Sequence, residues 1–138
     1  MTISRTTELG KITVSDLIFA QIIEKSFKLS ECRDKVWPAN LKGKQIGNEQ
    51  KFNLSDFAHE IEVESSSDEI NFSLTFNVII RFGASIKQIT NAMSDYISDT
   101  ILQKQGKRPE MIKIRVVGVK SKQIGKRNVE VVHRYEAE

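Results

Sequence analysis

The sequence predicts a small α+β domain in which two helices pack on one face of an antiparallel or mixed sheet. Three observations lead to this fold class: a long run of alternating apolar residues, a capped helix that follows it directly, and a second alternating run after that helix. With weaker elements before them, these give the order β-α-β-β-α-β. The chain has 138 residues, which is enough for one domain with its own core.

The first half of the chain contains less regular elements. Leu9–Val14 predicts a short first strand, and Ser15 is a suitable N-cap for a helix from Asp16 to Leu29. This helix is expected because its apolar residues recur at helical spacing, namely at Ile18, Phe19, Ile22, Ile23 and Phe27. The following stretch, residues 30–57, has no clear period and is predicted to be an irregular insertion with a short helical turn near Leu54–Ala58.

A hairpin is predicted next. Ile61 and Val63 alternate with glutamates, and the polar run Ser65–Asp68 separates them from a long strand between Ile70 and Phe82. Period-two alternation puts one set of side chains on a single face, so we expect the core to receive Ile70, Phe72, Leu74, Phe76, Val78, Ile80 and Phe82. The other face is expected to be polar and open, with Asn71, Ser73, Thr75, Asn77 and Arg81.

The second helix is the clearest in the sequence. Ser85 is its predicted N-cap, Gly106 and Pro109 end it, and its apolar stripe consists of Ile86, Ile89, Met93, Ile97 and Ile101. A last core strand follows, with Ile112, Ile114 and Val116 alternating with basic residues. We place a single domain at residues 1–119 and a basic C-terminal extension at residues 120–138. In this extension Val129, Val131 and Val132 indicate a further strand or a partner-binding segment.

Residues that usually carry out chemistry are few. Cys32 is the only cysteine and is predicted to be a buried, inert thiol. His59 and His133 are distant in sequence and have no neighbours at metal-ligand spacing, so we expect surface or hydrogen-bonded histidines. We therefore expect no catalytic residue, no metal site and no cofactor, and we expect the protein not to be an enzyme.

Charge is unevenly distributed along the chain. Residues 1–103 carry a net charge of −3 and residues 104–138 carry +6, while six acidic and no basic residues lie between Phe52 and Ile80. Two interpretations of the basic part remain open: a solvated surface, or a contact with an anionic partner such as nucleic acid or anionic lipid. The candidate contact residues are Lys113, Arg115, Lys120, Lys122, Lys126 and Arg127.

The element order is also that of RNA-recognition domains, which stack bases on aromatic residues of an open sheet face. Here the phenylalanines of the long strand share the predicted core face, and no basic-Gly-aromatic motif is present. A nucleic-acid-binding module is therefore the alternative function, not the first. The sequence has no apolar run long enough for a membrane span or a signal peptide, so we expect a cytoplasmic protein.

Three segments of the sequence form a recognisable set, namely residues 10–16 (GKITVSD), 78–86 (VIIRFGASI) and 114–119 (IRVVGV). In these segments the chain resembles the alkaline shock protein family, the cell-envelope stress-response proteins of Gram-positive bacteria. The resemblance implies a non-enzymatic interaction or scaffold protein that self-associates. It further implies a cytoplasmic location, with a peripheral position at the inner face of the membrane in those members that bind a membrane-anchored relative.

Overall fold

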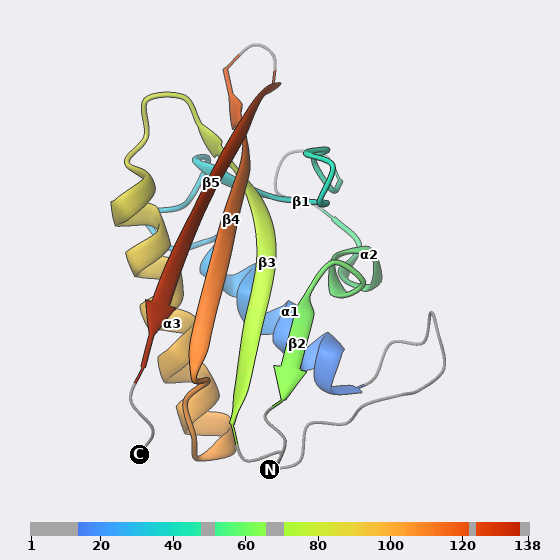
Figure 1. The fold of residues 1–138 in the computed structure, drawn as a ribbon, viewed down its shortest axis with the longest axis vertical. Coiled ribbons are helices and arrows are strands. Elements are labelled where there is room, and N and C mark those ends of the chain that lie inside the picture. Colours follow the sequence, from blue (N-terminus) through green and yellow to red (C-terminus); the bar gives the residue numbers. More distant parts are fainter. Residues whose placement is uncertain (1–13, 48–51, 66–70, 122–123, 136–138) are drawn as a thin grey trace.

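The computed structural model describes residues 14–47, 52–65, 71–121 and 124–135. In this part of the chain, helices and a five-stranded sheet form two layers, and Figure 1 shows α1 and α3 together on one face of the sheet. The predicted α+β class is thereby confirmed. Of the predicted strand Leu9–Val14, only Val14 is described, and it begins the first helix.

The helices are α1 (Val14–Ser26), α2 (Leu54–Ala58) and α3 (Ile86–Gln105). The strands are β1 (Val36–Ala39), β2 (Glu62–Ser65), β3 (Phe72–Arg81), β4 (Met111–Lys120) and β5 (Ile124–Arg134). The predicted helical turn near Leu54–Ala58 is confirmed as α2. The first helix starts and ends earlier than predicted, so Ser15 lies inside its first turn and does not cap it.

Strand β3 lies at the centre of the sheet. On one side it pairs with β1 along residues 77–80 and with β2 along residues 72–75, both antiparallel. On its other side it pairs with β4 in parallel, and β5 adds to β4 in antiparallel orientation. A parallel pair requires a crossover connection, which α3 provides. Strand β5 is therefore the outermost strand on the β4 side.

The ends of α3 are set by the residues that the sequence indicated. Ser85 accepts a hydrogen bond from the backbone N–H of Gln88 at 3.2 Å, which satisfies one of the free donors of the first turn. At the other end Gly106 adopts φ 77°, the left-handed conformation that glycine tolerates best, and its N–H donates to the carbonyl of Leu102.

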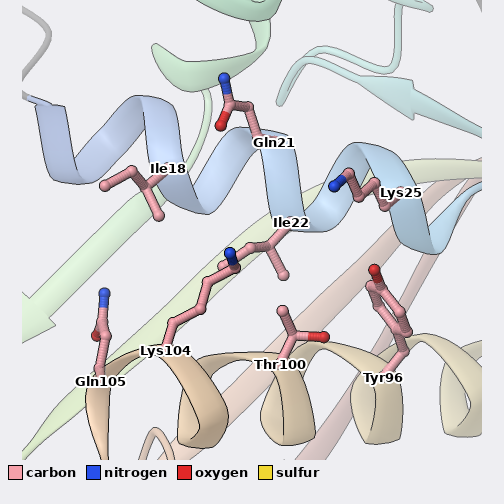
Figure 2. Close-up of a pocket in the computed structure, with 8 residues that line it drawn as sticks. All are labelled: Ile18, Gln21, Ile22, Lys25, Tyr96, Thr100, Lys104 and Gln105. Carbon is pink, nitrogen blue, oxygen red and sulfur yellow. The ribbon is translucent and has the colours of Figure 1, made fainter.

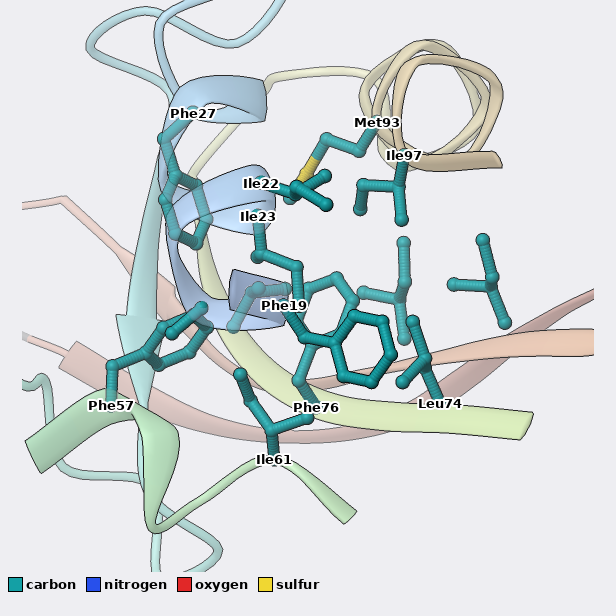
Figure 3. Packing of buried hydrophobic residues seen from close by; sticks show 14 of the residues in the cluster. Phe19, Ile22, Ile23, Phe27, Phe57, Ile61, Leu74, Phe76, Met93 and Ile97 are labelled. Atoms are coloured by element: carbon teal, nitrogen blue, oxygen red, sulfur yellow. The ribbon is translucent and has the colours of Figure 1, made fainter. Parts of the chain in front are cut away.

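Helices α1 and α3 cross the same sheet face side by side. Figure 2 shows Ile18 opposite Gln105 and Lys25 opposite Tyr96, so the two helices run in opposite directions. Their apolar sides meet the sheet in one core, and Figure 3 shows Phe19 and Ile23 of α1 with Phe76 of β3. Phe57 of α2 closes this core at the β2 side, with its ring centroid 6.2 Å from that of Phe76.

The predicted inward face of β3 is largely confirmed. Phe72, Leu74, Phe76, Val78 and Ile80 are buried among the helices. Ile70 lies outside the described residues. Phe82 contradicts the prediction because its side chain is 62% exposed. It follows the last residue of β3 in a turn with Gly83 at φ 86°, where strand alternation no longer fixes the side-chain direction.

The prediction of an open polar face is wrong for the middle of β3, although Arg81 at the end of the strand is exposed and Ser73 is half-buried. Thr75, Asn77 and Ile79 point away from the helices, yet they are 8%, 1% and 0% exposed. Ile79 packs with Trp37 and Ala39 of β1 in a second, smaller apolar cluster on this outer face. Side chains of a short strand inside the predicted irregular insertion therefore shield the part of this face around Ile79, which was expected to be solvated.

The predicted C-terminal extension also belongs to the sheet. Strand β5 pairs with β4 from Ile124 to Arg134, and Val129 and Tyr135 pack against the main core. Of the two alternatives for the valines, the structure has the strand. The boundary at residue 119 therefore does not separate a folded domain from an appended tail.

Candidate functional site

Five of the six predicted contact residues belong to β4 or β5. Lys113, Arg115 and Lys120 belong to β4, and Lys126 and Arg127 belong to β5. Lys122 and the side chains of Lys126 and Arg127 lie outside the described part. Lys113 and Arg115 alternate with buried residues of β4, so they lie on the outer face of the sheet, away from the helices.

Arg115 forms ion pairs with two other strands of the sheet. Its Nη1 lies 2.7 Å from a carboxylate oxygen of Glu62 on β2, and its Nε lies 3.1 Å from one of Glu130 on β5. The hydrogen bond to Glu62 is the main reason why the pKa of the Arg115 guanidinium is raised above its usual value. The side chain thus spans β3 and joins three strands, and its charge is already balanced by two carboxylates.

Lys120 also has partners nearby. Its ammonium nitrogen lies 4.5 Å from the ring centroid of Trp37 and 2.9 Å from Oε1 of Gln45. These contacts hold the loop after β1 against the outer face. Of the three described side chains in the predicted set, only Lys113 makes no ion pair or hydrogen bond with another described residue. The structure therefore does not gather the described members into one free basic surface.

Two buried polar side-chain groups lie on the outer face of the sheet. Oδ1 of Asn77 and Nε1 of Trp37 are shielded from solvent and have no hydrogen-bond partner. Asn77 pairs in the sheet with Ala39 on one side and with Arg115 on the other. This arrangement is not predictable from the sequence, because the alternation of β3 marks Asn77 as a solvent-facing residue.

His133 takes part in the only contact among the described residues that combines a hydroxyl, an imidazole and an amide. Its Nδ1 lies 3.1 Å from Oγ of Ser94, and its Nε2 lies 2.7 Å from Oδ1 of Asn91. Because an amide oxygen only accepts, Nε2 donates to Asn91, and in the neutral imidazole Nδ1 then accepts from the serine hydroxyl. Ser94 is completely buried between α3 and β5, where no substrate reaches it. We interpret these two hydrogen bonds as a structural link that holds β5 against α3.

Cys32 is placed as an inert residue. It is 0% exposed, and its Sγ lies 3.8 Å from the carbonyl oxygen of Ile89. Burial raises the pKa of the thiol to about 12, so the nucleophilic thiolate is not populated near neutral pH. His59 is exposed at the C-terminal end of α2.

A recess that the sequence did not reveal lies between α1 and α3 (Figure 2). Its volume is about 450 Å³, within the range of small-molecule sites. Helix α1 contributes Ile18, Gln21, Ile22 and Lys25, and α3 contributes Tyr96, Thr100, Lys104 and Gln105. Such a recess depends on the separation of two helices, which helical periodicity alone does not predict.

No helix in the described ranges has the length and apolar character needed to cross a membrane.

Comparison with known proteins agrees with the resemblance seen in the sequence. Neither the curated proteins nor the solved structures gave a match. A family model does match residues 4–121, which include most of the sheet and both long helices. The chain therefore belongs to the alkaline shock protein 23 family, which is described as having a cell envelope-related function.

Proposed function

We propose that this envelope-related protein is a non-enzymatic interaction module that self-associates through the two opposite edges of its sheet. The observation that carries the proposal is the contrast in charge between those edges. Figure 1 places β2 and β5 on opposite sides of the sheet. Each has one side of its backbone without a strand partner in the described part of the chain.

The β2 edge is acidic. Glu64 of this strand and Asp56 on the neighbouring α2 are exposed, and Glu62, although paired with Arg115, is also exposed. The β5 edge is basic in sequence, since Lys126, Arg127 and Arg134 outnumber Glu130. Two β5 edges repel each other, and so do two β2 edges, but one β5 edge attracts a β2 edge. The charges therefore favour head-to-tail contact over two-fold pairing.

Strand direction is compatible with this contact. Both β2 and β5 run antiparallel to the central β3–β4 pair, so they run parallel to each other. Copies related by a simple shift would place β5 of one beside β2 of the next, also in parallel. A heterologous contact of this kind does not close on itself, so it extends into open chains.

The positions of the reactive side-chain types support a role without catalysis. The one cysteine is buried as a thiol, His133 links β5 to α3, and His59 is exposed at the surface. No cluster of three potential metal ligands occurs among the described residues. A peripheral position beneath the membrane, through a membrane-anchored relative, is part of the same proposal and rests on the family resemblance.

A charge exchange tests the contact. One variant reverses the basic edge with Lys126→Glu and Arg127→Glu, and a second reverses the acidic edge with Asp56→Lys and Glu64→Lys. Each should be monomeric in light scattering at concentrations where the natural chain assembles, because both of its edges then carry the same sign. The chain with all four changes should assemble again, since its edges are complementary once more.

The matched control is Lys28→Glu with Lys87→Glu, two exposed lysines away from both edges. It should assemble like the natural chain. Unchanged assembly in both single-edge variants would reject the edge contact. A chain that stays monomeric and retains RNA or DNA, with affinity falling steeply between two salt concentrations, would instead favour the nucleic-acid-binding alternative.

A further inference from the structure

The recess between α1 and α3 has an apolar floor. Ile22 is 3% exposed at its base, and Ile18 and the ring of Tyr96 are half-buried beside it. From Tyr96 to Gln105 the recess follows α3 for about 13 Å at 1.5 Å per residue, and from Ile18 to Lys25 it follows about two turns of α1. This length suits a short extended chain better than a second protein helix.

The charged residues of the recess are all basic. Lys25 comes from the last turn of α1 and Lys104 from the last turn of α3, and no carboxylate lines the recess. Neither ammonium group makes an ion pair or hydrogen bond within the described part of the chain. Figure 2 shows Lys104 reaching across toward Ile22, and Lys25 above the Tyr96 hydroxyl. The hydroxyls of Tyr96 and Thr100 supply further hydrogen-bond donors on the same stretch of α3.

We propose that this recess binds a free single-chain amphiphile with a carboxylate head, such as a fatty acid. The apolar floor takes the hydrocarbon chain, because burying its methylene groups removes apolar surface from water. The head lies at the Lys25 and Tyr96 end of the recess and accepts hydrogen bonds from these two side chains, and the Lys104 ammonium, which reaches toward Ile22, adds a second positive charge. This binding is independent of the sheet edges and of self-association.

The shape of the surface argues for a free ligand over a bilayer. A protein that inserts into a membrane surface needs apolar side chains that project from it. The large apolar side chains that are strongly exposed in the described residues are Leu41, Phe82 and Val132, and none belongs to α1 or α3. The apolar groups here are recessed, so the hydrocarbon chain must enter the protein.

Calorimetric titration of the full chain with laurate, below its micelle concentration, tests this inference. Saturable binding of one laurate is expected. Lys25→Gln combined with Lys104→Gln should weaken it about tenfold or more, since charge-assisted hydrogen bonds are lost. The matched control, Lys28→Gln with Lys87→Gln, removes the same charge from lysines outside the recess and should leave affinity unchanged.

Two further measurements separate the contributions. Thr100→Phe places a ring in the recess and should abolish laurate binding, while circular dichroism and thermal unfolding show that the fold is retained. Dodecyltrimethylammonium, which has the same chain length but a cationic head, should not bind. Absence of laurate binding, equal binding of the cationic amphiphile, or binding only to phosphatidylglycerol vesicles would each overturn the proposal.

Discussion

Phe76 and Asn77 are neighbours on β3, and both are almost completely buried, in different surroundings. Phe76 points into the apolar core between the helices, as the alternation of the sequence predicts. Asn77 points to the opposite face, where residues from β1 and β4 cover it. Alternation identifies the two faces of a strand, but it does not say whether a distant segment covers the polar one. Here that segment includes Trp37, more than thirty residues away in sequence.

Substitutions at these two neighbours should have opposite consequences. Phe76→Ala should lower the free energy of unfolding by about 3–5 kcal/mol, as expected for loss of a core aromatic ring. Asn77→Leu keeps a similar branched shape and removes a buried oxygen that has no partner. It should be neutral or stabilising by about 1 kcal/mol. Urea unfolding of both variants measures this, and a loss of more than about 2 kcal/mol at position 77 would contradict our account of the outer face.

At the scale of elements, those with strong local signals were predicted and those formed by distant contacts were not. Helix α3 follows from its cap, its apolar stripe and Gly106, which are all local features. Strand β1 has only four residues and contains Pro38, so it has no detectable alternation of its own. It forms a strand because its backbone pairs with β3 in antiparallel orientation. The α1–α3 recess was likewise beyond prediction, since it depends on how two helices pack.

The ion pairs of Arg115 are an element-scale feature because they join β2, β4 and β5 across the outer face. Arg115→Met keeps an apolar stem but leaves Glu62 and Glu130 without their partner. We expect a loss of about 1 kcal/mol in unfolding free energy, since these carboxylates are about half exposed. Lys113→Met, two residues earlier on the same face, should change stability by less than about 0.5 kcal/mol.

Salt provides a second measure of the same ion pairs. The difference between the two methionine variants should shrink in about 1 M salt, where the screening length is about 3 Å. Urea unfolding at low and high salt tests this. Equal losses for both variants at low salt would mean that Arg115 acts through its position on β4 and not through its ion pairs.

For the whole molecule, β5 decides where the folded unit ends. The sequence predicts that the domain ends at residue 119, because the residues after it are strongly basic and only three valines suggest a strand. In the structure this segment forms the outer edge of the sheet and contributes Val129 and Tyr135 to the core. Composition shows where charge accumulates along the chain, but pairing with β4 is what makes the segment part of the domain.

Truncation separates the two views of this segment. A chain that stops after Lys120 exposes the full length of β4, uncovers part of the core and loses the hydrogen bonds of His133 to Asn91 and Ser94. We expect it to lose cooperative thermal unfolding, because β4 would become an unprotected edge and α3 would lose its link to β5. A chain that stops after Tyr135 keeps these contacts and should unfold within about 0.5 kcal/mol of the full-length protein. Differential scanning calorimetry compares the two, and a cooperative transition of similar enthalpy in the shorter chain would show that the fold is complete without β5.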